Sequence, residues 1–203
     1  MEQEEILKLA KEVIEEESRA IASLVQQLDM SFVRVAEALL SCQGHVLVAG
    51  SGTSHPVAAR LAHLLSCCGT PSLFIHPGDA QHGQSGALTD RDLLIAISKG
   101  GETLEVNHLA KIAQTRGTKV VALTENPDST LGRISDMVLK IAAPPDVDPY
   151  GMIATGSSLV NSALGDALCV VMLRLRGYSR ESFGQTHPGG AVGKKLSNEG
   201  GQP

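Results

Sequence analysis

Hydrophobic side chains recur every three or four positions along the first part of the chain. Residues 5–28 place them on one face of a helix, with Glu and Lys opposite, and a second helix is predicted over about 31–42. A first helix of this length cannot bury its apolar stripe alone. It therefore either packs across the domain or docks on another copy of the chain.

Beyond residue 44 the pattern changes to short apolar runs that alternate with helical spacing. Five strands are predicted at 45–49, 72–75, 92–97, 119–124 and 136–142, and helices at about 55–68, 102–115, 128–134 and 156–176. Strands that are apolar on both faces and alternate with helices are typical of a parallel sheet covered on both sides. The predicted fold is therefore α/β, with extra N-terminal helices.

The length of 203 residues suits one domain. We expect N-terminal helices in 1–43, the α/β core in 44–178 and a C-terminal site loop and tail in 179–203. No internal repeat or low-complexity linker separates a second domain.

Composition narrows the classes of partner. The net charge is −5, aromatic residues are 2% and Trp is absent, which argues against nucleic acid and against an anionic membrane surface. No apolar run approaches the roughly 20 residues that span a bilayer, and the acidic N-terminus is unlike a secretory signal. Cys42, Cys67, Cys68 and Cys169 form no CxxC pair and are interpreted as small hydrophobes in a reducing compartment. We expect a cytoplasmic protein.

Three loops rich in Gly, Ser and Thr follow strands or precede helices. The first contains Ser51, Gly52, Thr53 and Ser54. Its hydroxyls and amides precede a helix, where a phosphate is stabilised. A purely structural turn is the alternative, and the loop is neither a complete dinucleotide fingerprint nor a Walker loop.

The second loop runs from Ser98 to Thr103 and offers both hydroxyls, Lys99 and glycine amides to phosphate oxygens. Its Glu102 is either a first-turn carboxylate on a helix dipole or a catalytic group. In the third loop, Thr155 and Ser157 are phosphate ligands or simple helix caps. Because ligands of open parallel sheets bind beyond the carboxyl ends of the strands, the convergence of these loops predicts a phosphorylated small molecule.

The histidines fall into two groups. His76, His82 and His187 lie in loops beside Gly and Pro, where catalytic groups often sit. A metal site is the alternative, but the metal-ligand spacings are missing, so no metal is predicted. The remaining histidines, His45, His55, His63 and His108, are interpreted as packing or surface residues, with His55 alone a candidate to line the site.

Several segments together carry a resemblance to a known family. They are VLVAGSGTS (46–54), FIHPGDAQHG (74–83), ISKGGE (97–102), LTENPDSTLGRISD (123–136), GDAL (165–168) and HPGGAVGKKL (187–196). Over about residues 5–196 the chain resembles the SIS (sugar isomerase) domain, and within it the single-domain arabinose-5-phosphate isomerases that lack CBS domains. The resemblance implies a flavodoxin-like sheet and a homo-oligomer, a tetramer or dimer, with sites shared between subunits. It also implies interconversion of ribulose 5-phosphate and arabinose 5-phosphate without a cofactor.

The same resemblance implies roles for individual residues. The family's phosphate-binding hydroxyls fall on Ser51, Ser54 and Ser98. Its active-site carboxylates fall on Glu102 and Asp146, and its active-site histidines on His82 and His187.

An aldose–ketose isomerase moves a proton between adjacent carbons through a cis-enediol. We expect Glu102 or Asp146 as the base, with a pKa raised by partial burial, and His187 or His82 to serve the oxygens.

The chain departs from the family pattern at four positions near the site. Thr53 stands where a lysine is usual, Gly100 replaces a serine, Gln84 replaces an acid and Asp146 stands where glutamate is common. Lys99 adds a positive charge and is hypothesised to take over the missing one. Two alternatives follow: an isomerase of another pentose or hexose phosphate, and a non-catalytic sugar-phosphate sensor.

Overall fold

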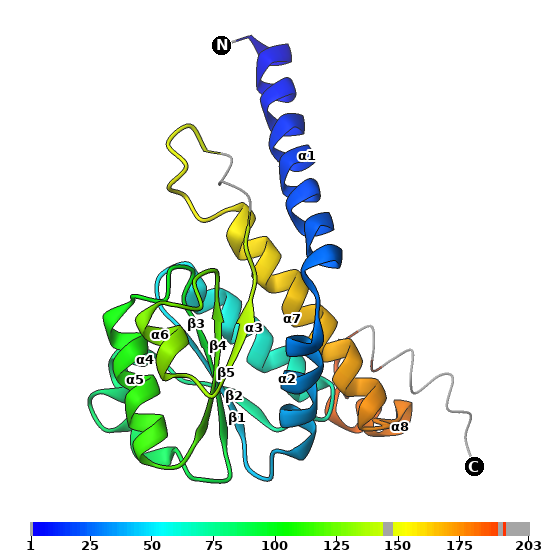
Figure 1. Ribbon diagram of the computed structural model, residues 1–203. Helices are drawn as coiled ribbons and strands as arrows, with labels where there is room; N and C mark the ends of the chain where they lie inside the picture. Colours follow the sequence, from blue (N-terminus) through cyan, green and yellow to red (C-terminus); the bar gives the residue numbers. More distant parts are fainter. Residues whose placement is uncertain (1, 144–147, 191–192, 194–203) are drawn as a thin grey trace, which may run out of the picture.

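Five parallel strands form the centre of the molecule, with helices on both faces (Figure 1). The computed structural model describes residues 2–143, 148–190 and 193. The strands are β1 (Val46–Gly50), β2 (Ser72–Phe74), β3 (Leu93–Ile97), β4 (Lys119–Thr124) and β5 (Met137–Lys140), in the order β2-β1-β3-β4-β5. The predicted α/β fold with a five-stranded parallel sheet and extra N-terminal helices is confirmed.

The predicted helices appear within a few residues of their expected bounds. The helices are α1 (Gln3–Gln27), α2 (Met30–Ser41), α3 (Ser54–Cys67), α4 (Pro77–Ala80), the 3-10 helix η1 (Gln84–Ala87), α5 (Leu104–Thr115), α6 (Thr130–Ile134), α7 (Gly156–Leu175) and α8 (Arg180–Thr186). The sequence did not predict α4, η1 or α8. The first two span about one turn, too short for a 3.6-residue period to show, and α8 is too polar to carry an apolar stripe.

The alternation of side chains along each strand divides the core into two layers. Val46 and Val48 point into a cluster with α1, α2, α3 and α7, whereas Leu47 and Ala49 point into a cluster with α4, α5 and α6. Each of the central strands β1 and β3 is buried on both faces, as its continuous apolar run predicted.

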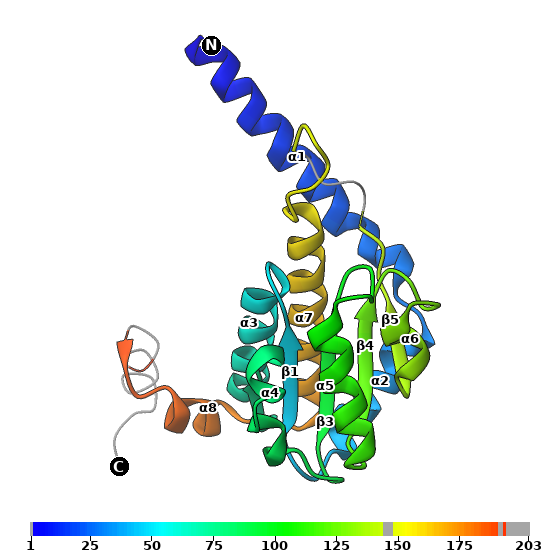
Figure 2. The same cartoon turned by 90° about the vertical axis from the view of Figure 1, so that its left-hand side faces the viewer.

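The long first helix is only partly used by its own chain. Ala20 and Leu24 near its C-terminal end are buried in the core. Its N-terminal half extends beyond the rest of the molecule (Figures 1 and 2) and leaves Ile6 52% and Ile14 62% exposed. The apolar face of this helix was expected to pack either across the domain or on another copy of the chain. Packing across the domain covers only its C-terminal half.

One expectation about membranes needs correction. Within the described part of the chain, α7 is long and apolar enough to cross a bilayer by length and composition, with a mean hydropathy of 1.4. In the fold this helix packs against α1 and α3, and Val160, Leu164 and Met172 are buried in the core. Its place in the domain accounts for part of this apolar composition, since 33% of the apolar stretch is buried inside the structure.

Candidate functional site

The carboxyl ends of β1 and β3 lie side by side at the point where the strand order reverses. Gly50 at the end of β1 pairs with Ile97 at the end of β3, so the loops that begin at Ser51 and Ser98 leave the sheet together. The chain continues from β1 to β2 on one side and later reaches β3 on the other. Open parallel sheets bind ligands in the crevice at such a point.

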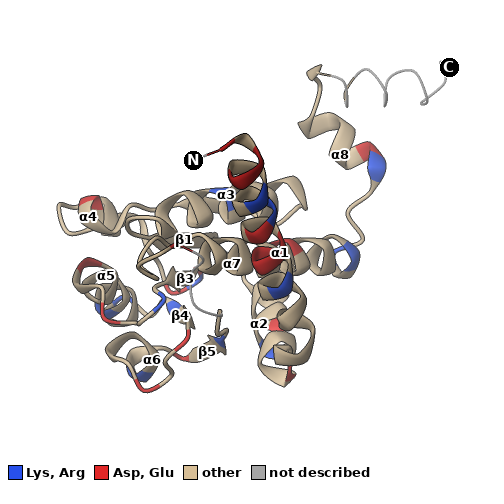
Figure 3. Ribbon diagram, turned by 90° about the horizontal axis from the view of Figure 1, so that it is seen from above, with Lys and Arg blue, Asp and Glu red and all other residues tan. Residues whose placement is uncertain are grey.

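The three loops predicted to form the site contribute to one small pocket at this edge. The edge is viewed from above in Figure 3. Its lining residues are Thr53, Ser54 and Val57 from the first loop and α3, Lys99 from the second loop, and Ala154, Ser157, Ser158 and Asn161 from the third loop and α7. Four residues with hydroxyl side chains, one asparagine and one lysine therefore line a shared space between the N-termini of two helices.

Asn161 was not among the residues predicted for the site. It lies on the second turn of α7, directly after apolar Leu159 and Val160. The one signal in the sequence was an amide side chain within the predicted helix, which ordinary solvent exposure explains equally well. Only the packing of α3 beside α7 shows that it faces the pocket.

The first loop brings its backbone close to the start of α3. A Cβ added at Gly50 would lie 2.6 Å from the Ser54 carbonyl oxygen, so this position requires glycine. Gly52 has a φ of +57°, and its carbonyl accepts a hydrogen bond from the His55 N–H. The Ser54 N–H likewise donates to the Ser51 carbonyl oxygen, so the loop enters α3 through a tight turn that places the start of the helix at the edge of the site.

The second loop is held by its own side chains. Ser98 is only 3% exposed, its Oγ lies 2.9 Å from Thr103 Oγ1, and it accepts a hydrogen bond from the Gly101 N–H at 3.2 Å. Asn107 Nδ2 donates to the Gly101 carbonyl oxygen at 3.2 Å. Ser98 therefore has a structural role in the loop that does not depend on whether its hydroxyl also binds a ligand. Asn107 was missed, although it is a buried amide on the apolar face of the predicted helix.

Glu102 is engaged by a different element. Its Oε1 accepts a hydrogen bond from the Thr130 N–H at 2.8 Å, and its Oε2 accepts one from the Thr130 hydroxyl at 2.7 Å. These hydrogen bonds, the hydroxyl first, lower the pKa of the exposed Glu102 carboxyl, and Arg133 adds to the effect. This differs from the expected base with a pKa raised by burial, because the bonds stabilise the ionised form.

The third loop does not cap its helix in the expected way. Thr155 immediately precedes α7 but makes no capping hydrogen bond with its side chain, and its buried Oγ1 has no hydrogen-bond partner among the described residues. Ser157 is buried beside it, at 4% exposure. The simple N-cap interpretation of Thr155 is therefore wrong.

Three rings stand in series beyond the ends of β1 and β2. The His55 ring lies 4.4 Å from the Phe74 ring and 5.4 Å from the His76 ring, between centroids. His76 Nδ1 accepts a hydrogen bond from the Asp79 N–H at 3.4 Å, which starts α4. His55 directly follows Ser54, which lines the pocket, so this series of rings begins one residue from the pocket lining.

The other two predicted histidines lie elsewhere in the chain. His82 follows α4 and is exposed, beside Gln81, whose Oε1 lies 3.1 Å from His108 Nδ1 on α5. His187 directly follows α8 and is stacked on Phe183, with ring centroids 3.9 Å apart. That helix lies toward the end of the sheet opposite the pocket (Figures 1 and 2). The chain alone therefore does not bring His187 to Lys99 or Glu102.

Asp146, the other predicted carboxylate, lies outside the described residues. Asp148 nearby is described, and its carboxylate accepts hydrogen bonds from the N–H groups of Tyr150, Met152 and Ile153. That carboxylate organises the loop before α7. In the described part of the chain, no three His, Cys, Asp or Glu side chains gather as a metal site would require.

Comparison with known proteins agrees with this architecture. The model of the SIS domain family matches residues 39–171. The arabinose 5-phosphate isomerase KdsD of Yersinia pestis is 37% identical over 186 residues, which is 92% of this chain and 57% of that protein. The chain thus spans little more than half the length of this curated relative.

Two solved structures share nearly the whole chain. A candidate sugar-phosphate isomerase from Listeria monocytogenes is 35% identical with a TM-score of 0.91, covering 93% of this chain and 100% of that one. A protein of Escherichia coli CFT073 in complex with arabinose 5-phosphate is 30% identical with a TM-score of 0.90, at the same coverage.

Proposed function

Because the chain belongs to the SIS domain family, we propose that it is a sugar-phosphate isomerase that interconverts an aldose phosphate and a ketose phosphate. The substrates proposed first are ribulose 5-phosphate and arabinose 5-phosphate, since the KdsD relative is named for the latter and the Escherichia coli structure contains it. The reaction requires proton transfer and no redox cofactor.

The pocket shared by three loops is the observation that carries this proposal. A phosphate dianion needs hydrogen-bond donors and positive charge, and the pocket offers the hydroxyls of Thr53, Ser54 and Ser157 together with the ammonium of Lys99. The N-termini of α3 and α7 add the positive ends of two helix dipoles. Lys99 lines the same pocket as Thr53, which supports the hypothesis that Lys99 supplies the cation the family usually carries at position 53.

The proton transfer needs a base and a group that serves the oxygens. In the proposed reaction a carboxylate removes the proton from the carbon beside the carbonyl, which gives a cis-enediol, and returns it to the neighbouring carbon. Glu102, three positions after Lys99 in the second loop, is the first candidate for this role, and Asp146 is the second. A histidine exchanges the proton between the two oxygens near neutral pH.

A homo-oligomer with shared sites reconciles His187 with this mechanism. His187 lies far from the pocket of its own chain, so its proposed role requires that a second copy presents it. The exposed apolar side chains of α1, among them Ile6, Leu9 and Ile14, offer a surface on which copies of the chain can pack. We propose a dimer or tetramer on these grounds.

A second function is favoured by one observation. Glu102 is held as an ionised, doubly hydrogen-bonded carboxylate, which is less suited to removing a proton than a base with a raised pKa. A protein that binds a sugar phosphate without converting it, as a sensor does, is compatible with this arrangement. An isomerase acting on another pentose or hexose phosphate is compatible with the pocket as well.

Proton exchange followed by NMR separates these functions. The protein is mixed in D2O with ribulose 5-phosphate and then with a panel of pentose and hexose phosphates. New arabinose 5-phosphate that carries deuterium at C2 supports the proposed reaction and its enediol, and exchange with another member redirects the substrate. Binding in a thermal-shift assay without exchange for any member supports the sensor and contradicts the enzyme.

A further inference from the structure

The segment after β4 and the first turn of α6 hold the second loop at several points. Leu131 donates its N–H to the Gly101 carbonyl oxygen at 3.0 Å, and Glu125 donates its N–H to the Lys99 carbonyl oxygen at 2.9 Å. A Cβ added at Gly101 would overlap Ser129 Oγ. The loop that carries Glu102 is therefore packed against the start of α6, and the position of Glu102 depends on that helix.

We infer that Thr130 is a positioning residue, which fixes the Glu102 carboxylate at the carboxyl edge of the sheet through its backbone N–H and its hydroxyl. Each donor takes a different oxygen, at 2.8 Å and 2.7 Å. Two bonds to two oxygens fix the rotation of the carboxylate plane as well as its place. The inference rests on the isomerase function proposed above and adds a residue that acts through Glu102.

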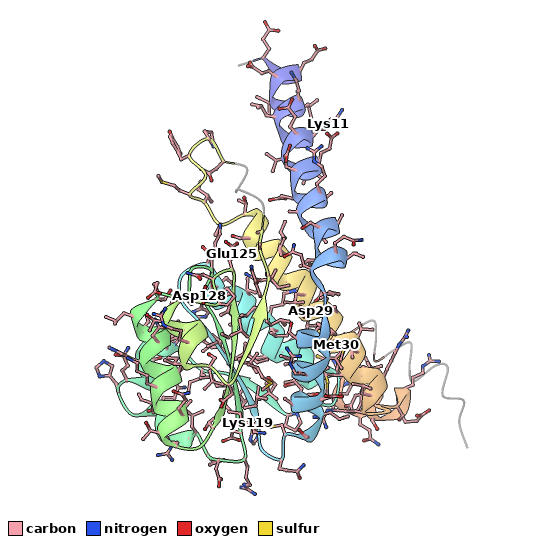
Figure 4. The ribbon with its side chains drawn as sticks, in the orientation of Figure 1. Lys11, Asp29, Met30, Lys119, Glu125 and Asp128 are labelled. Atoms are coloured by element: carbon pink, nitrogen blue, oxygen red, sulfur yellow. The ribbon has the colours of Figure 1, made fainter. Side chains whose placement is uncertain are left out.

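The charges around Glu102 agree with a fixed, ionised carboxylate. Arg133 on α6 is the cation that favours its charge, and the Arg133 guanidinium also donates to the Asp128 carbonyl oxygen. Lys99 lies on the same loop. The acidic residues of the segment that precedes α6 are Glu125 and Asp128, labelled in Figure 4, and the Glu125 carboxylate accepts a hydrogen bond from the Ala143 N–H at 3.1 Å. The Thr130 hydroxyl is the largest single influence that keeps Glu102 charged.

The Thr130 hydroxyl is expected to affect the turnover rate as well as the stability of α6. A carboxylate that caps α6 needs only one acceptor for the Thr130 N–H. The second bond restrains the other oxygen, which otherwise rotates freely. Removal of the hydroxyl alone therefore leaves the cap in place but releases the orientation of Glu102 and weakens its preference for the charged form.

The test compares Thr130→Val, which lacks the hydroxyl, with Thr130→Ser, which keeps it. Thr130→Ala is the second hydroxyl-free variant, used if the valine does not fold. Thr115→Val removes an exposed hydroxyl that bonds only to the Lys111 carbonyl on α5 and serves as the matched control. Two readouts are taken: the carbon-13 NMR titration of the Glu102 carboxyl, assigned with Glu102→Gln, and the pH profile of kcat on the sugar phosphate that the exchange assay identifies.

We expect Thr130→Val to titrate Glu102 at higher pH, to move the acid limb of the kcat profile in the same direction, and to lower kcat about tenfold or more with little change in KM. Thr130→Ser should restore both readouts, and Thr115→Val should leave them unchanged. A lower Tm with unchanged titration and pH profile would show that Thr130 only stabilises the start of α6 and would overturn the inference. If the wild-type protein turns over no sugar phosphate, the function proposed above fails, while the titration still decides the role of Thr130.

Discussion

Arg60 and Asp166 join α3 to α7 through two parallel hydrogen bonds. Arg60 Nη1 donates to Oδ1 at 2.6 Å and Nη2 donates to Oδ2 at 3.1 Å. The two helices bear opposite walls of the candidate pocket, with Ser54 at the start of one and Asn161 in the second turn of the other. The ion pair therefore ties together the helices whose spacing sets the width of the site.

This pair is expected to contribute modestly to stability. Both side chains are 47% exposed, so solvent screens the attraction, and the coupling energy should be about 0.2–1 kcal/mol. A double-mutant cycle with Arg60→Ala and Asp166→Ala, measured by urea unfolding, tests this value. The coupling should shrink in about 1 M salt, and a value well above this range that resists salt would contradict the expectation.

Gly101 should be among the least replaceable residues of the second loop. Its φ is +71°, and an added Cβ would overlap Ser129 Oγ. Gly101→Ala should therefore lower the free energy of unfolding by roughly 1–3 kcal/mol and weaken sugar-phosphate binding. Gly100→Ala is the matched control, because a Cβ there meets open space. Equal unfolding midpoints for the two variants would contradict this account.

The sequence predicted the sheet and the three loops because the information they need is local. Continuous apolar runs such as 93–97 show strands buried on both faces, and parallel strands necessarily end at one edge. The partners within the site are not local. Glu102 meets Thr130 across 28 positions of the chain, and Asn161 reaches the pocket only because α7 packs beside α3. No spacing rule in one sequence connects such pairs.

The position of His187 shows a different limit of sequence reasoning. The motif around it indicated a site residue, but α8 carries it toward the opposite end of the sheet. A motif indicates that a residue belongs to an active site. It does not indicate whether the other residues of that site lie on the same copy of the chain. The role of His187 stays a prediction, which the last experiment below addresses.

Lys99 should supply much of the affinity for the phosphate group. Lys99→Ala should raise the Kd for ribulose 5-phosphate about 10–100-fold, since a charge-assisted contact to an anion is lost. Calorimetric titration at two salt concentrations checks this, and the variant should show the weaker salt dependence. Lys119→Ala is the control, because this lysine begins β4 at the far edge of the sheet (Figure 4). Equal Kd values for the two variants would contradict the proposed cradle.

Asp92 should make folding stability depend on pH. Burial alone would raise its pKa, but hydrogen bonds from the His45 N–H and from the Thr89 N–H and hydroxyl outweigh burial and lower the pKa. A pKa lower in the folded than in the unfolded chain stabilises the fold above the unfolded value of about 3.9, and this stabilisation is lost as the pH falls through the folded value.

Asp92→Asn should therefore cost about 1–3 kcal/mol at pH 7, because one amide oxygen cannot serve three donors. The difference from the wild type in urea unfolding should shrink as the pH falls below about 4. Asp128→Asn, whose side chain is exposed, should change little at either pH. A difference that grows on acidification would show that the ionised Asp92 destabilises the fold.

Subunit complementation decides whether His187 serves the pocket of another copy. Lys99→Ala and His187→Ala should each lower kcat/KM strongly when assembled alone. If each site combines Lys99 of one copy with His187 of its partner, variants refolded together form mixed dimers in which one site carries both wild-type side chains. Random mixing of two chains then restores about a quarter of wild-type activity.

Lys99→Ala mixed with Ser98→Ala, two changes in the same loop, should restore none and serves as the control. If His187 instead acted on the pocket of its own chain, a mixed dimer would contain only sites with one defect each, and the mixture would stay as inactive as its parts.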